Sequence, residues 1–436
     1  MSRVPPPAEA IARIWGSRDL PADFEALCDV GGRFAGSESE ARARALLRER
    51  LDAIAAGLPG ARVLELPFEY QGWARESTRL LRVAPGEARA LAAHALVWSP
   101  PTPPGGLEAE VVDLGRGTPE DFAQAGTRLT GRFALVRHEY PFASGVIHRR
   151  VKYGLAREYG AAGFLIASNL PGQVLVTGSS GVGGADDIPA AGLTLEGGEA
   201  LAPRAGVPAR ARLEVAVRRG PARAANLVLE VPGAGPEWVV LSAHYDGHDL
   251  AESALDNATG VAAVLEIVRA LGPHVPRARR GLRAMLFTVE EWGLYGSRVY
   301  ADGLDEEACR AIALNVNLDT IAGGGRLAAL VSGFADLGDW VSAAARDAGL
   351  DLRVVVPLMP NSDHANFARR GIPALRLVAG FDDPQAGPRY LLTTADTRDK
   401  VHAADLKAGT LVAAEIVWRA LAWEGQVAVH RERTGG

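Results

Sequence analysis

The sequence has few of the features that would place it in a specialised class of protein. Its 436 residues contain only 2 cysteines, which excludes a disulfide scaffold and predicts two buried free thiols. The net charge is −5, and no basic stripe carries interleaved aromatic residues, so we expect no nucleic-acid partner. No apolar run reaches transmembrane length, and the N-terminus lacks the apolar core of a signal peptide. We therefore expect a cytoplasmic protein without a membrane partner.

The remaining composition is that of an ordinary globular protein. Hydrophobic residues make up 48% of the chain and charged residues 23%. A chain of 436 residues has room for a full catalytic domain and a second module. Composition therefore leaves the function to be found in local patterns.

The most informative stretch runs from residue 238 to residue 271. Residues 238–243 form a short, apolar, β-branched run typical of a buried strand. The run ends in His244 and Asp246, and a second carboxylate, Asp256, follows in the loop. Apolar residues then repeat at helical spacing over 260–271. The pattern predicts a strand, a polar loop and a buried helix.

Three further apolar runs are flanked by polar groups of the same kind. Residues 282–289 end in Glu290 and Glu291, residues 311–318 end in Asp319, and residues 373–379 are preceded by His364. In open parallel sheets the functional crevice lies at the carboxyl ends of the strands. Imidazole and carboxylate ligands suit zinc, and one carboxylate can bridge two ions. Two adjacent carboxylates in a dry crevice also favour a neutralising cation, so the pattern predicts a metal site.

The ordered motifs resemble those of a known family. In chain order they are His-x-Asp at 244–246, Asp-Asn-Ala-Thr-Gly at 256–260, Glu-Glu at 290–291 before Gly-Leu-Tyr-Gly-Ser at 293–297, Asn-Leu-Asp at 317–319, and Ser-Asp-His at 362–364 before Gly-Ile-Pro at 371–373. Together they resemble the co-catalytic zinc peptidases of the bacterial leucyl aminopeptidase and glutamate carboxypeptidase type, metallopeptidase family 28. The resemblance implies an α/β fold, with a mixed, mostly parallel central sheet flanked by helices.

A second resemblance concerns the middle of the chain. From about residue 86 to 219, short strands alternate with Gly/Pro turns, and the runs at 131–136, 160–166 and 188–189 resemble a protease-associated (PA) domain. We predict a catalytic domain over 8–85 and 220–428, a smaller inserted α/β domain over 86–219, and a polar tail over 429–436. Within the first range, Ser37 and Glu40 predict a capping box at the start of a long helix.

The family resemblance also implies roles for the polar residues. Asp256 would bridge two zinc ions, His244 and Asp319 would complete one site, and Glu291 would help to hold the other. Asp246 would hydrogen-bond His244 and fix its tautomer. Glu290 would be the general base that acts on a zinc-activated water. The implied function is a metal-dependent exopeptidase that hydrolyses a terminal peptide bond, either an aminopeptidase, which is the favoured form, or a carboxypeptidase.

One position departs from the family pattern. A second-zinc histidine is expected just before the Thr393–Thr397 stretch, but residue 392 is leucine, which cannot bind a metal. His364 is the first candidate for a replacement ligand and His402 a weaker one. We interpret His248, in the loop after the first strand, as a supporting or solvent-exposed residue.

The departure at Leu392 leaves several functions open. Two zinc ions are expected from the family, and a single ion is the alternative. A one-zinc chain would be an amidohydrolase or would resemble the family's glutaminyl cyclases. A chain without metal would be a non-catalytic interaction protein with a peptidase fold. The expected partner of the enzyme forms is a peptide or a small amide substrate.

Overall fold

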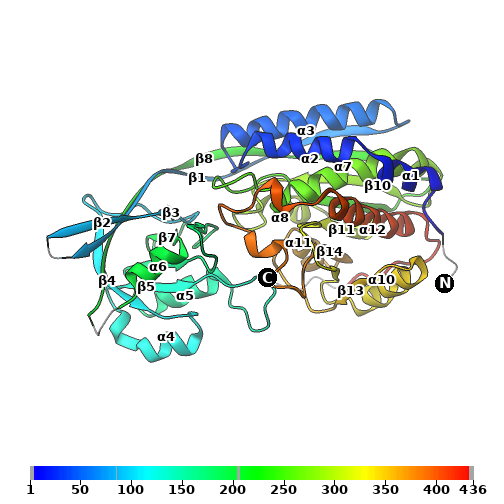
Figure 1. Ribbon diagram of the computed structural model, residues 1–436. Coiled ribbons are helices and arrows are strands. Elements are labelled where there is room, and N and C mark those ends of the chain that lie inside the picture. The colour runs from blue at the N-terminus through cyan, green and yellow to red at the C-terminus, as the bar shows by residue number, and fades with distance from the viewer. Residues whose placement is uncertain (1–3, 85, 204–206, 432–436) are drawn as a thin grey trace. The chain divides into compact units, whose positions relative to one another are not determined.

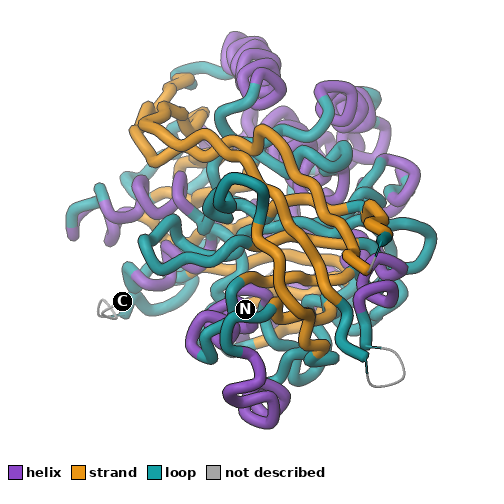
Figure 2. The backbone as a smooth tube through the Cα atoms, turned by 90° about the vertical axis from the view of Figure 1, so that its left-hand side faces the viewer, coloured by secondary structure: helices purple, strands orange, loops and turns teal. Residues whose placement is uncertain are grey.

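A computed structural model describes residues 4–84, 86–203 and 207–431. The chain divides into two compact units. The first comprises Met1–Glu69, Arg223–Leu391 and Asp396–Gly436, and the second comprises Tyr70–Ala222 and Leu392–Ala395. The predicted insert, 86–219, lies within the second unit. Long strands β1 (Arg62–Ala84) and β8 (Arg210–Val231) contribute residues to both units, and Figure 2 draws strands as orange tubes.

The first unit is built on a mixed sheet in which most neighbouring strands are parallel. The strand order is β13-β12-β14-β11-β9-β10-β8. Strand β9 lies parallel to β10 and β11, β11 lies parallel to β14, and β12 lies parallel to β13. The pairs β8–β10 and β12–β14 are antiparallel. The predicted α/β fold, with a mixed, mostly parallel sheet flanked by helices, is confirmed. The strands not yet bounded are β9 (Trp238–His244), β10 (Gly281–Phe287), β11 (Ile312–Leu318), β12 (Leu327–Leu330), β13 (Leu352–Val355) and β14 (Ala374–Ala379).

Helices cover both faces of this sheet (Figure 1). Along β10, Leu282, Ala284 and Leu286 face one core cluster, while Met285 and Phe287 face the other, as the period of two in a strand requires. The larger cluster includes helices α1 (Ala8–Gly16), α2 (Asp19–Val30), α3 (Glu38–Ala56), α7 (Thr259–Leu271), α10 (Ala335–Ala348) and α12 (Ala403–Ala422). The opposite face carries α8 (Tyr295–Asp302), α9 (Glu306–Ala311) and α11 (His364–Arg369).

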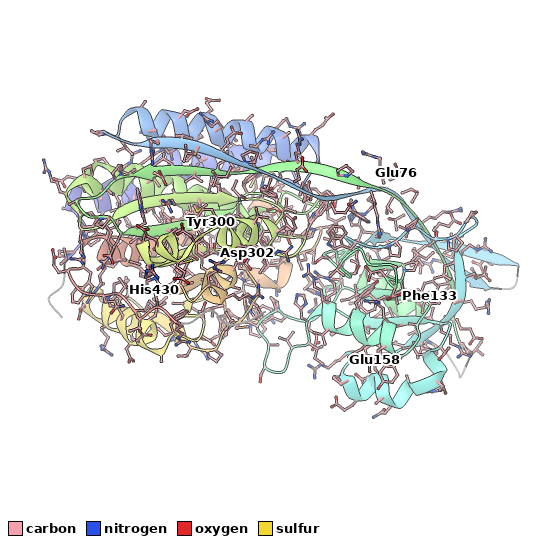
Figure 3. All side chains as sticks on the ribbon, turned by 180° about the vertical axis from the view of Figure 1, so that it is seen from behind. Glu76, Phe133, Glu158, Tyr300, Asp302 and His430 are labelled. Carbon is pink, nitrogen blue, oxygen red and sulfur yellow. The ribbon has the colours of Figure 1, made fainter. Side chains whose placement is uncertain are left out.

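The smaller cluster contains an aromatic group. Tyr300, labelled in Figure 3, lies with its ring centroid 6.1 Å from that of Phe287 and 5.9 Å from that of Phe367. The side chains of Phe287 and Phe367 are fully buried. This contact fixes α8 and α11 against the sheet. Helix α8 follows Glu290 and Glu291 in the chain, and α11 begins at His364.

Helix α7 is the most deeply buried helix of the first unit. It continues from the short π-type turn η2 (Ala254–Ala258) and leads into the 3-10 turn η3 (Gly272–Arg277). By length and composition the run Ala254–Arg277 could cross a membrane, with a mean hydropathy of 1.2. However, 83% of its apolar window is buried inside the fold, and α7 packs on α1, α2, α12 and the sheet. We therefore describe it as a core helix.

The second unit has its own core, and within it β4 pairs antiparallel with the start of β8. Strands β4 (Leu107–Asp113), β5 (Phe133–Arg137), β6 (Gly163–Ala167) and β7 (Ala190–Leu193) are neighbours in parallel register, and β3 (Ala93–Ala95) closes the edge in antiparallel register. Helices α4 (Pro119–Ala125), α5 (Arg149–Glu158) and α6 (Leu195–Leu201) belong to this unit, as does β2 (Glu87–Leu91). Phe133, labelled in Figure 3, is fully buried in β5.

Candidate metal centre

The polar residues singled out in the sequence lie at one edge of the first unit's sheet. His244 is the last residue of β9, Asp319 directly follows β11, and Glu290 comes three residues after β10. Because β10 and β11 both run parallel to β9, their carboxyl ends meet at the same edge. The sheet topology thus brings together groups that are up to 75 residues apart in the chain.

Three of these side chains form a compact cluster. His244 Nε2 lies 3.1 Å from Asp256 Oδ1 and 3.8 Å from Asp319 Oδ1. One ligand atom from each residue lies within 4.8 Å of the others, and within residues 4–84, 86–203 and 207–431 no other trio of such groups does so. His244 is fully buried and Asp319 is nearly so. One imidazole nitrogen and two carboxylates in this arrangement fit the ligand chemistry of zinc.

The loop that carries Asp256 is fixed by hydrogen bonds on both sides. Asp396 accepts hydrogen bonds from the backbone N–H groups of Leu255, at 2.7 Å, and Asp256, at 3.2 Å. Asn257 Nδ2 donates to Leu318 O, at 2.8 Å, and its Oδ1 accepts from the N–H of Gly260, at 3.0 Å. These bonds tie the start of α7 to the end of β11, and so they position Asp256 beside Asp319.

Glycine is required at residue 260 because the Asn257 side chain and the Leu318 carbonyl lie close to its Cα atom. A Cβ atom there would lie 2.4 Å from both Asn257 Oδ1 and Leu318 O. The Asp-Asn-Ala-Thr-Gly motif is therefore a structural unit: it supplies the candidate ligand, the amide that fixes the ligand, and the residue that makes room for the amide.

Asp246 organises the neighbouring loop. Its carboxylate accepts hydrogen bonds from the backbone N–H groups of Glu290, at 3.1 Å, and Glu291, at 3.3 Å. The nearest oxygen of Asp246 to His244 Nδ1 is the backbone carbonyl, at 3.2 Å, and Oδ1 lies 3.6 Å away. Asp246 thus contacts the imidazole mainly through its main chain, and its side chain holds the Glu290–Glu291 backbone in place.

Glu290 and Glu291 lie in an unfavourable environment for negative charge. Burial raises the pKa of the Glu290 carboxyl well above its usual range, and the nearby Asp363, Glu291 and Asp319 raise it further, against the opposing effect of His244. Burial and the charge of Asp256 likewise raise the pKa of Glu291. Glu291 Oε1 is buried and has no hydrogen-bond partner in the described part of the chain. A bound cation would neutralise the buried negative charge and would give Glu291 Oε1 a partner, so these residues fit a metal.

The pKa of His244 is raised by the same acidic surroundings. Burial lowers the pKa of its imidazole, but the charge of Glu290 and the contacts with Asp246, Asp256 and Asp319 outweigh burial and raise the pKa well above its usual value. The opposite case is Asp319, where burial is outweighed by the Arg376 guanidinium, 3.1 Å away, and the pKa is lowered. The cluster is therefore a region of negative potential, which attracts a cation.

His364 lies at the start of α11 and is fully buried. Burial and the positive charge of Arg376 lower the pKa of His364 to about 3, with Asp319 acting in the opposite direction. The adjacent Asp363 is also buried, and burial raises its pKa to about 7. His364 is thus influenced by Asp319, one of the three residues of the compact cluster.

Leu392 occupies the position of the missing histidine, and His402 is the weaker candidate for its replacement. Leu392 belongs to the short Leu392–Ala395 segment of the second unit, where its carbonyl accepts a hydrogen bond from the N–H of Thr177 at 2.7 Å. His402 is exposed and occupies the N-cap of α12.

Of the two interpretations of His248, a supporting or a solvent-exposed residue, the structure excludes exposure. The residue is only 4% exposed, and its Nε2 lies 2.7 Å from Glu291 Oε2. Its loop position suggested exposure, but the sequence could not show that the buried Arg33 draws this loop inward. The spacing of His248 from His244, four residues, was the available signal.

Comparisons with known proteins agree with this geometry. Residues 226–417 match the family model of peptidase family M28, and residues 107–201 match that of the PA domain. Aminopeptidase YwaD of Bacillus subtilis is 26% identical over 396 residues, which cover 89% of this chain and 81% of YwaD. The probable lipoprotein aminopeptidase LpqL of Mycobacterium tuberculosis is 33% identical over 239 residues, covering 53% of this chain and 45% of LpqL. The chain thus spans less than half the length of that relative.

Solved structures show the same fold. The aminopeptidase from Aneurinibacillus sp. strain AM-1 superimposes with a TM-score of 0.69 at 26% identity, over 98% of this chain and 97% of that one. The zinc aminopeptidase BSAP from Bacillus subtilis gives a TM-score of 0.71 at 23% identity, over 99% and 100% of the two chains. The similarity therefore extends over both units.

Proposed function

The chain belongs to peptidase family M28 through residues 226–417, and from this premise we propose that it is a zinc-dependent aminopeptidase that removes the N-terminal residue of a peptide. The observation that carries the proposal is the cluster of His244, Asp256 and Asp319, with the Glu290–Glu291 pair at the same strand ends. The names of the relatives YwaD and LpqL, both aminopeptidases, support the choice of the amino end.

In this proposal His244, Asp256 and Asp319 would hold one zinc ion, and Glu291 and Asp256 would help to hold a second. Zinc at these positions would polarise the scissile carbonyl and lower the pKa of an attacking water. Asp246 contributes by fixing the backbone of both glutamates through hydrogen bonds to their N–H groups. Supporting contacts of this kind keep the functional carboxylates within reach of the reaction.

Glu290 is the proposed general base. Its carboxylate takes a proton from the attacking water as the new carbon–oxygen bond forms at the scissile carbonyl. It then delivers that proton to the leaving amine as the carbon–nitrogen bond breaks, so Glu290 ends the cycle unprotonated.

Hydrolysis of leucyl-p-nitroanilide by the zinc-loaded protein tests the proposal, with N-acetyl-leucyl-p-nitroanilide as the matched control. We expect turnover of the first compound and none of the second, because an aminopeptidase requires a free terminal amine. Equal turnover of the two compounds would contradict an aminopeptidase and support an amidohydrolase. Failure to hydrolyse any of a panel of aminoacyl anilides would contradict the proposal as a whole.

A further inference from the structure

The second metal position of this chain lacks an obvious nitrogen ligand. Leucine stands at residue 392, where the resemblance to the zinc peptidases calls for histidine, and an aliphatic side chain has no lone pair to offer. Glu291 nevertheless presents a buried Oε1 atom with no hydrogen-bond partner among the described residues. A second site built on Glu291 and Asp256 therefore needs a neutral nitrogen donor beside Glu291.

His248 provides a nitrogen at that position. Its Nε2 lies 2.7 Å from Glu291 Oε2, and the two side chains are 5% and 7% exposed. Two ligand atoms of one tetrahedral zinc ion, each about 2.0–2.1 Å from the metal, are separated by about 3.3 Å. The observed contact is shorter by about 0.6 Å, so zinc binding would move these two atoms apart. It would also bring Asp256 closer, because these three residues are not among the ligand groups that lie within 4.8 Å of one another in the described part of the chain.

The loop that carries His248 is held from several sides. The N–H of His248 donates to Ser253 Oγ at 3.0 Å, and the N–H of Gly247 donates to Arg33 O at 3.0 Å. The fully buried guanidinium of Arg33 donates to the carbonyls of Tyr245, Glu252 and Ser253 at 2.7, 2.7 and 2.8 Å. The imidazole is thus presented on a fixed loop, as a metal ligand requires.

The other histidines are less suited to this position. His364, the first residue of α11, makes no ion pair with Glu291 or Asp256 in the described part of the chain. His402 is exposed at the N-cap of α12. His248 is the histidine in direct contact with Glu291.

We propose that His248, together with Glu291 and Asp256, binds the second zinc ion and so replaces the histidine missing at residue 392. The proposal rests on the zinc-peptidase function proposed above and names a ligand of its metal centre. It makes His248 a metal ligand and not only a hydrogen-bond partner of Glu291.

Zinc content is the first test. Elemental analysis of dialysed wild-type protein, His248→Ala and the matched control His364→Ala should give two, one and two zinc ions per chain. Two ions in His248→Ala, one ion in His364→Ala, or one ion in the wild type would each overturn the proposal and leave the first zinc site intact. A wild-type chain without zinc would instead contradict the proposed function itself, so the two failures are distinguishable.

A second variant covers the case in which His248→Ala does not fold. In His248→Cys, a thiolate would replace the imidazole, and thiolates bind zinc and cobalt. With Co²⁺ in the centre, we expect a new thiolate-to-cobalt charge-transfer band in the near-ultraviolet spectrum of His248→Cys. Wild type, with its two buried thiols, and His402→Cys, with a cysteine at an exposed position, are the controls. Absence of the band in folded His248→Cys, or its presence in His402→Cys, would overturn the proposal.

Discussion

At the scale of single residues, the centre combines buried carboxylates with very few buried cations. Glu290, Glu291 and Asp363 all have a pKa raised by burial, and the charge of His244 opposes that rise in each of them. A protein interior tolerates such a group only when protons or metal ions compensate the charge. In the proposed centre Glu290 transfers a proton and Glu291 binds metal, and substitution can separate these two roles.

Glu290→Gln separates proton transfer from metal binding. We expect the turnover number for leucyl-p-nitroanilide to fall by about 10²- to 10⁴-fold, the usual contribution of a general base. The zinc content should not change, because Glu290 is not among the proposed ligands. Steady-state kinetics and elemental analysis of the same preparation check both statements. Near-wild-type turnover would show that another group acts as the base.

At the scale of secondary-structure elements, loops pinned to buried side chains position the centre. Gly32 precedes Arg33, and a Cβ atom at residue 32 would lie 2.0 Å from His248 O and 2.7 Å from Ala251 O. The close approach of the two backbones is thus possible only with glycine. It links the segment before α3 to the loop between β9 and α7.

Gly32→Ala should therefore destabilise the protein by about 1–3 kcal/mol or more, because the inserted methyl group must displace the His248 loop. The matched control is Gly16→Ala, where a Cβ atom would meet nothing within 4 Å. Urea unfolding of the two variants and the parent measures the difference. Equal stability of Gly32→Ala and Gly16→Ala would contradict the close packing described here.

Helix α7 carries a second element-scale prediction. The Glu266 side chain is fully buried, 3.5 Å from Arg13 and 3.6 Å from Arg269, and burial raises the pKa of its carboxyl despite these cations. The folded state therefore holds the proton more tightly than the unfolded state. This contribution to stability is present below the unfolded pKa and is lost as the pH rises through the folded pKa.

Glu266→Gln removes that titration. Its melting temperature relative to the parent should increase as the pH rises from 4 to 8, because the parent alone acquires a buried charge. Thermal unfolding across this range is the measurement, and Glu424→Gln, at a side chain that is 89% exposed, is the control. A difference that stays constant with pH would contradict the assignment.

The elements also show how far the sequence alone could lead. Short apolar runs predicted the buried parallel strands. The polar residues that follow these runs predicted the cluster of His244, Asp256 and Asp319, because the carboxyl ends of parallel strands lie at the same side of a sheet. Contacts between residues far apart in the chain could not be predicted from the sequence. Ser37 caps α3 as predicted, but the Glu40 side chain is buried and accepts a hydrogen bond from Tyr245 Oη at 2.8 Å. Likewise, the inward position of His248 depends on Arg33, which is more than 200 residues away.

At the scale of the whole molecule, the chain consists of two compact units with separate cores. The proposed ligands all belong to the first unit, whereas the match to the PA domain falls in the second. A ligand that binds only the folded state stabilises it, by about 2.7 kcal/mol at a concentration 100 times the dissociation constant. Zinc should therefore stabilise mainly the unit that binds it.

Removal of zinc should increase amide hydrogen exchange in peptides that cover β9, η2 and β11. Exchange in β5 and β6, which form the centre of the second unit's sheet, should remain unchanged. Mass spectrometry of peptides from zinc-loaded and chelator-treated protein makes the comparison. An equal loss of protection in β5 and β6 would contradict the assignment of the metal centre to the first unit.

The central claim is that zinc bound to the residues of the first unit enables hydrolysis of the substrate. It is tested most directly by a titration of chelator-treated protein with zinc, in which bound zinc and leucyl-p-nitroanilide turnover are measured in the same samples. We predict that the chelator abolishes turnover and that activity returns in proportion to zinc bound at the centre. Turnover that persists in zinc-free protein, or that stays absent when the zinc content is restored, would contradict the account.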